Sequence, residues 1–327
     1  MIPFWILDFG LWIATLGSTT PEIASGNAAS STVIGMIDLA PHNPYTLELA
    51  SPLIAAAGSL GYGIEVARQL RLGQRDGGHG LGALITRSTT LRPRRAHPPP
   101  ALIETPAGLL YTGSAQNPGL RAVRQRFAPI WATWETPVIL SVAAADENEL
   151  GALLAELESL DGVRGVELPL AMFGVSAPAA AARLVAAARA ATPLPLIVKL
   201  PVYAEHLAEL GASAAASGAD ALSLSDGLPA TAVVAGQRSD GLLCGPALRP
   251  LGLRAVAHLA TKVNLPLIGG GGVMRAADAH ALFEAGATAV ALGSALLTDL
   301  RAAGRVLADL AVTSDSSAVD SPDRSDP

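Results

Sequence analysis

The chain contains eight short apolar runs separated by segments with helical periodicity, and this alternation limits the folds open to it. The apolar runs occupy residues 53–57, 83–86, 137–142, 165–168, 195–200, 219–224, 265–269 and 288–292. Ala-, Leu- and Arg-rich segments with helical spacing occupy residues 147–160, 178–191, 204–217 and 276–285. Such alternation is typical of βαβ units and a parallel sheet. Eight units favour a closed (β/α)8 TIM barrel, an α/β fold in a single domain, over an open doubly wound sheet.

The composition is strongly apolar, and the same fold accounts for it. The chain is 50% hydrophobic and 15% charged, with a mean hydropathy of +0.40. No apolar run approaches the ~20 residues that a membrane-spanning helix needs. Because buried parallel strands are apolar on both faces, a barrel wrapped by Ala-rich helices explains this balance without a transmembrane segment.

The predicted barrel occupies residues 36–311, between an N-terminal extension and a tail. Residues 1–35 begin with an apolar stretch interrupted by Asp8, and no Lys or Arg precedes Arg68, which argues against a secretory signal. An interfacial anchor, a loosely ordered tail and an upstream start codon remain open for this extension. Residues 312–327 are rich in Ser, Asp and Pro without apolar periodicity, which predicts a disordered tail.

Charge and cysteine usage exclude several classes of function. The net charge is −6 and the isoelectric point about 5.5, which gives no basic footprint for nucleic acid. The single cysteine, Cys244, excludes an internal disulfide and a cysteine-built zinc site. The six histidines show no HxxxH spacing, so we expect no metal. A cytoplasmic location follows from the same features.

Two Gly-rich turns follow the seventh and eighth predicted strands. The first contains Gly271 and Gly272, and the second is Gly293-Ser294. Glycines at a helix N-terminus let an anion approach the backbone amides, and the helix dipole favours negative charge. In β/α barrels the loops after strands seven and eight are the usual phosphate site. We therefore predict phosphate binding here, against the alternative of tight turns that serve only packing.

Polar residues also stand at the ends of other predicted strands. Lys199 lies in an apolar run, where a buried ammonium is costly unless it meets an anion or a hydrogen-bond acceptor. Near a flavin it would stabilise the negative charge of the reduced ring, whereas a snorkelling lysine is the alternative. Gly58 and Ser59 follow the first strand, where a flat ring can lie against the glycine. Arg87 begins a hydroxyl-rich segment after the second strand, for which a solvated loop is the alternative.

Taken together, these motifs resemble the class 1 dihydroorotate dehydrogenases in order and spacing. The resemblance covers residues 36 to about 297 and rests on segments 58–63, 86–100, 104–108, 116–119, 198–200, 244–247 and 271–273. It implies an FMN-dependent barrel that oxidises dihydroorotate to orotate in pyrimidine biosynthesis. It assigns FMN binding to Gly58, Ser59, Lys199, Gly245, Gly271, Gly272, Gly293 and Ser294. Asn117 would face a pyrimidine substrate.

The resemblance also implies partners without choosing among them. Class 1 relatives use fumarate or a separate iron–sulfur and FAD subunit carrying NAD as electron acceptor. An electron-transfer subunit and a homodimer therefore both remain open for this chain.

The chain departs from the family in the substrate half of the site. Where the family has Glu-Leu-Asn-Ile-Ser-Cys-Pro-Asn with Cys as the base, residues 167–174 place Met172 at the base position. A thioether has no titratable group, so Met172 cannot accept a proton, and the catalytic residue is unknown. Pro169 and Gly174 replace the asparagines, and Asp226-Gly227 replaces an Asn-Thr pair.

Further departures concern the remaining contacts. Ser141 replaces an asparagine in strand three, and Arg87 a lysine. We interpret Cys244 as a packed thiol. Three readings stay open: a working dihydroorotate dehydrogenase with its base elsewhere, an FMN oxidoreductase acting on another substrate, and a non-catalytic flavin-binding paralogue.

Overall fold

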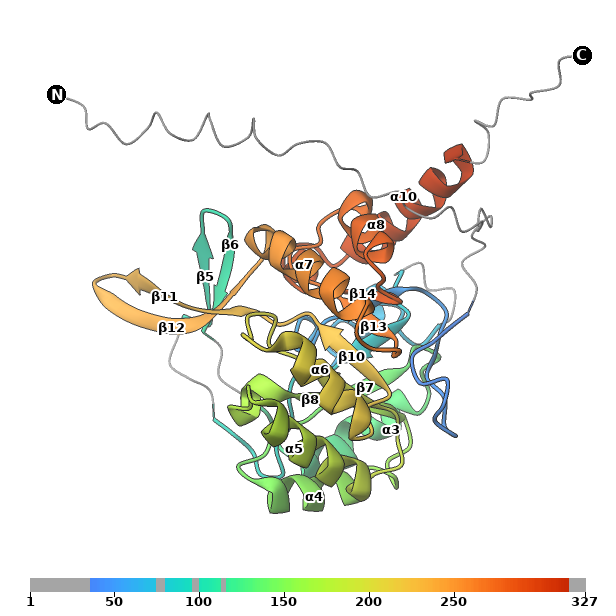
Figure 1. Ribbon diagram of the computed structural model, residues 1–327, viewed down its shortest axis with the longest axis vertical. Helices are drawn as coiled ribbons and strands as arrows, with labels where there is room; N and C mark the ends of the chain where they lie inside the picture. The colour runs from blue at the N-terminus through green and yellow to red at the C-terminus, as the bar shows by residue number, and fades with distance from the viewer. Residues whose placement is uncertain (1–35, 75–79, 96–99, 113–115, 318–327) are drawn as a thin grey trace, which may run out of the picture. The chain divides into compact units, whose positions relative to one another are not determined.

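The computed structural model describes residues 36–74, 80–95, 100–112 and 116–317 (Figure 1). Eight parallel strands close into a barrel in the order β10-β13-β14-β3-β4-β7-β8-β9. These are β3 (Leu53–Ala55), β4 (Ala83–Ile85), β7 (Val138–Ser141), β8 (Val163–Pro169), β9 (Leu196–Lys199), β10 (Ala221–Leu224), β13 (Leu267–Gly269) and β14 (Ala289–Leu292). One strand falls on each predicted apolar run, so the predicted (β/α)8 barrel is confirmed.

Helices alternate with the strands along the chain. They are α1 (Ala67–Leu70), α2 (Leu120–Ala122), α3 (Ala128–Trp131), α4 (Glu147–Ala155), α5 (Pro178–Ala191), α6 (Leu207–Ala216), α7 (Arg249–Ala260), α8 (Ala276–Glu284), α9 (Ser294–Thr298) and α10 (Ala302–Ser317). The bounds of α5 match the prediction, and Pro178 stands at its first position, where no amide donor is needed. The carboxylate of Asp146 caps α4 by accepting from the Glu149 backbone N–H.

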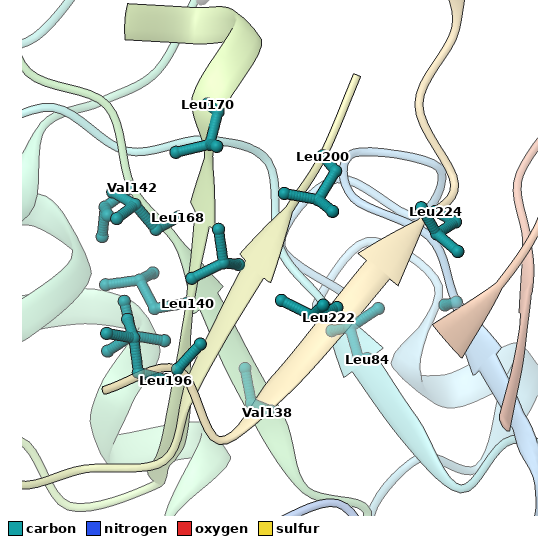
Figure 2. Close-up of a cluster of buried hydrophobic side chains, with 14 of the residues drawn as sticks. Leu84, Val138, Leu140, Val142, Leu168, Leu170, Leu196, Leu200, Leu222 and Leu224 are labelled. Carbon is teal, nitrogen blue, oxygen red and sulfur yellow. The ribbon is translucent and has the colours of Figure 1, made fainter. Parts of the chain in front are cut away.

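Successive residues of each barrel strand point alternately into the barrel and toward the surrounding helices, and so form two separate buried layers. One buried cluster takes Ile54, Ile85, Ile139, Ile197 and Ile268 from five barrel strands. The strand residues between these positions join a second cluster that also contains helix residues. Its members in Figure 2 include Leu84, Val138, Leu140, Leu168, Leu196, Leu222 and Leu224. Because neighbouring strand residues face opposite sides, the first cluster fills the barrel and the second joins it to its helices.

Two antiparallel elements were absent from the sequence prediction. A hairpin of β1 (Ile37–Asp38) and β2 (Glu48–Leu49) contributes Leu39 and Leu49 to the interior cluster. A four-stranded sheet contains β5 (Leu102–Thr105), β6 (Gly108–Tyr111), β11 (Leu228–Val234) and β12 (Gln237–Cys244). The β11–β12 hairpin extends away from the barrel (Figure 1). Its central residues Ala235 and Gly236 both have positive φ, as a type I′ turn requires.

The structure describes the carboxyl-terminal end of the predicted barrel but not the segment that precedes its amino-terminal end. The N-terminal extension, residues 1–35, lies outside the described residues. Helix α10 continues to Ser317 and so enters the segment predicted as a disordered tail, while residues 318–327 lie outside the described part. Among the described residues, no helix combines the length and the apolar character needed to cross a membrane.

A polar network ties the amino-terminal end of β9 to the helix before it. The Asp220 carboxylate accepts hydrogen bonds from Arg189 Nη1 at 2.9 Å, Asn43 Nδ2 at 3.1 Å and the Leu196 backbone N–H at 2.8 Å. Its side chain is 14% exposed. One carboxylate therefore satisfies three donors from separate segments of the fold.

We expect Asp220→Asn to destabilise the fold by about 1–3 kcal/mol, because it removes a charged acceptor and places an amide against existing donors. The matched control is Glu156→Gln, which removes the carboxylate paired with Arg124 where both side chains are largely exposed. Exposed pairs contribute about 0–1 kcal/mol, so the control should change little. Chemical denaturation measures both, and equal losses would contradict the structural role of Asp220.

Candidate active site

The predicted site residues come from loops and strand ends at the carboxyl-terminal face of the barrel. Gly58 and Ser59 follow β3, Lys199 ends β9, Gly245 follows β12, Gly271 and Gly272 follow β13, and Gly293 and Ser294 follow β14. In a parallel barrel the carboxyl ends of all strands meet at one mouth, which is where β/α barrel enzymes build their active sites. The fold therefore brings segments far apart in the sequence to one face.

Three glycines let the loops at this mouth pack backbone against backbone. Gly272 has φ +75°, and a Cβ there would lie 2.4 Å from the Gly245 carbonyl oxygen. Gly245 has φ +118°, and its Cβ would lie 2.7 Å from Gly108 Cα. No side chain fits at either contact, so Gly245 and Gly272 have a packing role. This role coexists with the predicted phosphate contact, which stays a prediction.

Two other glycines face space at the mouth. A Cβ on Gly58, at φ +76°, would meet only Arg87 Cα at 3.9 Å. A Cβ on Gly293 would meet only Ala56 Cβ, at 3.6 Å. Ser294 is the first residue of α9, where backbone N–H groups lack acceptors within the helix. Backbone N–H groups that can donate and unobstructed space therefore lie together here, as the binding of a phosphate group requires.

A buried ion pair lies at the ends of β8 and β9. Lys199 Nζ is 3.4 Å from Glu167 Oε1, and the two residues are 6% and 0% exposed. Glu167 Oε2 is buried and has no hydrogen-bond partner within the described chain. A buried carboxylate oxygen without a donor is costly, so this atom points to a missing donor group. Sequence reasoning selected Lys199 but missed Glu167, although the same signal, a charge in an apolar strand, applied to both.

Opposing influences set the charge state of Lys199. Desolvation by burial acts to lower its pKa, but the Glu167 and Asp226 carboxylates outweigh it and leave the pKa raised. The amine therefore stays protonated at neutral pH. A fixed ammonium at the mouth can stabilise negative charge on a bound ring.

Asp226 and Cys244 lie close to this pair. Burial raises the pKa of the Asp226 carboxyl, while Lys199 and the Gly227 backbone N–H oppose the rise. That N–H donates to Asp226 Oδ1 at 2.9 Å. Burial and the Asp226 carboxylate raise the pKa of Cys244 to about 11. Cys244 is therefore a neutral thiol at neutral pH, in keeping with its interpretation as a packed residue.

Arg87 adds a second cation from the loop after β4. Its backbone N–H donates to the Gly61 carbonyl at 2.9 Å, while Nε is buried without a partner in the described part of the chain. The neighbouring Ser88 hydroxyl lies 2.9 Å from the Ser141 hydroxyl. Arg87 and Glu167 therefore both hold an unsatisfied buried polar atom, one a donor and the other an acceptor. An acceptor next to Arg87 Nε and a donor next to Glu167 Oε2 would satisfy them.

Two predicted ligand-binding side chains already have hydrogen bonds within the protein. The Ser59 hydroxyl donates to the Ala56 carbonyl at 2.7 Å, which leaves its lone pairs for a ligand. The Asn117 side chain is buried, accepts from the Thr90 and Gly119 backbone N–H groups, and donates to the Thr90 hydroxyl. It shapes the loop between β6 and α2. Substrate contact by Asn117 stays a prediction.

Met172, at the position of the family's base, lies in a short 3₁₀ helix (Leu170–Phe173) after β8 and is 41% exposed. Gly174 ends this helix at φ +64°, with no atom within 4 Å of a Cβ placed there. The segment therefore supplies no titratable side chain. Nor do the described residues contain a cluster of three or more potential metal ligands.

The residues at the mouth fit FMN. Gly58 and Gly293 leave the backbone open to a flat ring and a phosphate, and Lys199 supplies a fixed positive charge. The unsatisfied atoms of Glu167 and Arg87 call for a ligand with both donors and acceptors. Assignment of individual cofactor contacts remains a prediction.

Comparisons with known proteins agree with this geometry. A family model described as dihydroorotate dehydrogenase matches residues 42–313. The chain is 38% identical over 278 residues to the catalytic subunit of dihydroorotate dehydrogenase B (NAD(+)) from Desulforudis audaxviator, covering 81% of this chain and 89% of the relative. The protein of the same name from Geotalea uraniireducens is 36% identical over 272 residues, covering 79% and 87%.

We expect Gly293→Leu to lower FMN content at least about tenfold while leaving the fold intact, because its side chain would enter the space next to the α9 amides. Gly271 has φ +93°, so substitution there would also strain the backbone. The control is Gly151→Leu on α4, where a Cβ has no atom within 4 Å. Flavin absorbance of the purified proteins is the measurement. Normal flavin content in Gly293→Leu would refute the phosphate assignment.

We expect Lys199→Met to weaken FMN binding about ten- to hundredfold and to make the flavin harder to reduce, because a charge-assisted contact is lost. The substitution also leaves Glu167 as an unpaired buried charge, which by itself destabilises the fold. The double variant Lys199→Met, Glu167→Gln removes that complication. Flavin titration and the reduction potential are the measurements. An unchanged potential in the double variant would contradict the assignment.

Proposed function

The chain belongs to the dihydroorotate dehydrogenase family, and we propose that it is an FMN-dependent oxidoreductase. The observation that carries the proposal is the buried Lys199–Glu167 pair at the barrel mouth, with one carboxylate oxygen unsatisfied among the described residues. A flavin ring carries both an N–H donor and carbonyl acceptors, and so can serve both members of the pair. The family relationship and this pair support the same cofactor.

In the proposed mechanism, different residues of the mouth stabilise charge, bind the phosphate and accommodate the ring. FMN, when bound, supplies the acceptor for the hydride removed from the substrate. Lys199 would place its positive charge beside a bound ring and so favour negative charge on it. Gly271, Gly272, Gly293 and Ser294 are proposed to hold the phosphate through backbone amides. Gly58, at φ +76°, leaves room for the flat ring.

The proposed reaction is oxidation of dihydroorotate to orotate in pyrimidine biosynthesis, as the family implies. A second candidate is the same chemistry on an uncharged substrate, and a specific observation favours it. Asp226 lies partly accessible at the mouth in place of the family's amide, where its carboxylate opposes an anionic ligand. The third candidate is a non-catalytic flavin protein, which would bind flavin without being reduced by either substrate.

The proposed partners follow the relatives. These are named as catalytic subunits of an NAD(+)-linked enzyme. We expect this chain likewise to pass its electrons to a separate subunit and so to NAD(+), instead of to fumarate. A homodimer and a cytoplasmic location stay predictions from the sequence.

We expect dihydroorotate to bleach the flavin slowly, about 10²- to 10⁴-fold below the rate of a relative with the cysteine base, because Met172 leaves the family's base position without a titratable group and the Asp226 carboxylate opposes an anionic substrate. The measurement is anaerobic mixing of the oxidised protein with excess dihydroorotate and, separately, with uncharged dihydrouracil. Dithionite reduction is the control for an intact flavin. Faster bleaching by dihydrouracil would favour the second candidate, whereas no bleaching by either compound would favour a non-catalytic role.

A further inference from the structure

We propose that Asp226 is the proton acceptor for substrate oxidation at this site, in place of the base that the chain lacks at Met172. The inference rests on the proposed flavin function. Asp226 follows β10 at the carboxyl end of the barrel and is partly accessible. Its Oδ1 accepts from the Gly227 backbone N–H, and Oδ2 has no hydrogen-bond partner in the described chain. One carboxylate oxygen is therefore available to a ligand.

The surrounding backbone keeps this carboxylate in place. A Cβ on Gly227 would lie 3.2 Å from Cys244 Sγ and 2.8 Å from Leu242 Cβ, so the β10 loop packs closely on β12. On β9, the Lys199 ammonium interacts electrostatically with Asp226. Asp226 thus has a fixed backbone, and its cationic neighbour favours the ionised form in which a carboxylate can accept a proton.

The other titratable groups around Asp226 do not meet the requirement for a base. Lys199 and Cys244 both have raised pKa values and hold their protons at neutral pH. The pKa of Tyr203, on the loop after β9, is raised by burial and by Asp226 itself, so its phenol stays protonated. Glu167 is fully buried and paired with Lys199.

Three further charged or titratable groups from the same face also lack the properties of the base. Arg87 is a cation, and Glu205 and His206 are exposed at the start of α6. Neither Glu205 nor His206 has a side-chain hydrogen bond or ion pair to the mouth residues within the described ranges. Among the described groups around the mouth, Asp226 is therefore the carboxylate that is both accessible and in electrostatic contact with Lys199.

The proposed step balances with flavin as the oxidant. One carbon of the substrate loses hydrogen with its electron pair to the flavin, and the neighbouring atom loses a proton to Asp226. The electrons of that second bond form the new double bond. Asp226 becomes a neutral carboxylic acid, and it returns its proton to water at the open mouth.

The test compares Asp226→Asn, the amide found in the family, with the exposed control Glu205→Gln. Flavin content and dithionite reduction are measured first to establish that each variant is loaded. With saturating dihydroorotate or dihydrouracil, we expect Asp226→Asn to lower the rate of flavin bleaching about 10²- to 10⁴-fold. Orotate is the binding probe, and the variant should bind it at least about tenfold more tightly because a like charge is removed. Glu205→Gln should change neither quantity.

Slower bleaching together with tighter orotate binding distinguishes a base from a residue that only repels anions. A purely repulsive Asp226 predicts tighter orotate binding together with equal or faster bleaching, which would overturn the proposal. The pH dependence gives a second test. As pH rises through the pKa of Asp226, wild-type bleaching should accelerate because the base ionises, while orotate binding should weaken. Both dependences should vanish in Asp226→Asn.

The outcomes also separate this inference from the proposed function. Absence of flavin, or of bleaching by both compounds, would reject the proposed function. In that case the orotate titration, followed by calorimetry, still shows whether Asp226 faces the ligand, which the proposal requires. Identical pH dependence of orotate binding in wild type and Asp226→Asn would show that Asp226 does not face the ligand, and would overturn the proposal.

Discussion

Eight strands that close on themselves have to fill the space they enclose, and this requirement determines where the chemistry of the molecule can lie. Isoleucines such as Ile139 and Ile197 fill the barrel interior away from the carboxyl ends of the strands. Two residues further along the same strands, and on the same side, stand Ser141 and Lys199. The barrel interior is therefore apolar toward the amino ends of the strands and polar at their carboxyl ends. A buried charge is tolerated there because a partner and a ligand-facing mouth are both within reach.

The same alternation explains which parts of the fold were predictable. Parallel barrel strands are buried on both faces, so they appear in the sequence as continuous apolar runs, and all eight were recognised. The sheet of β5, β6, β11 and β12 is partly exposed and lacks such runs. Its hairpin turn uses Ala235-Gly236, without the Asn-Gly or Asp-Gly signal. Pairing of β12 with β6 also joins segments far apart in the sequence, which local patterns cannot reveal.

A glycine can be predicted from the sequence where the backbone itself leaves no room for a side chain. Gly245 and Gly272 stand where a Cβ would overlap another loop, so their spacing is a strong signal. Asn117 is a different case, because its side chain forms hydrogen bonds with Thr90 and with the Gly119 backbone that the sequence did not predict, while its contact with a substrate stays a prediction. A motif identifies the residue but not the partner that its side chain selects. The Glu167 contact with Lys199 depends on the register of β8 and β9, which only the folded structure gives.

Charge balance at the mouth links the departures from the family to one physical consequence. Arg87 and Lys199 bring two positive charges, and Glu167 and Asp226 bring two negative charges when ionised. The family's amide in place of Asp226 would leave one net positive charge, which suits an anionic substrate. At low effective dielectric one such charge is worth several kcal/mol at about 4 Å, so a single substitution changes which ligands are favoured. The carboxylate that discourages an anion can also accept a proton, so in the proposed mechanism the loss of the family's base and the gain of Asp226 act on the same step.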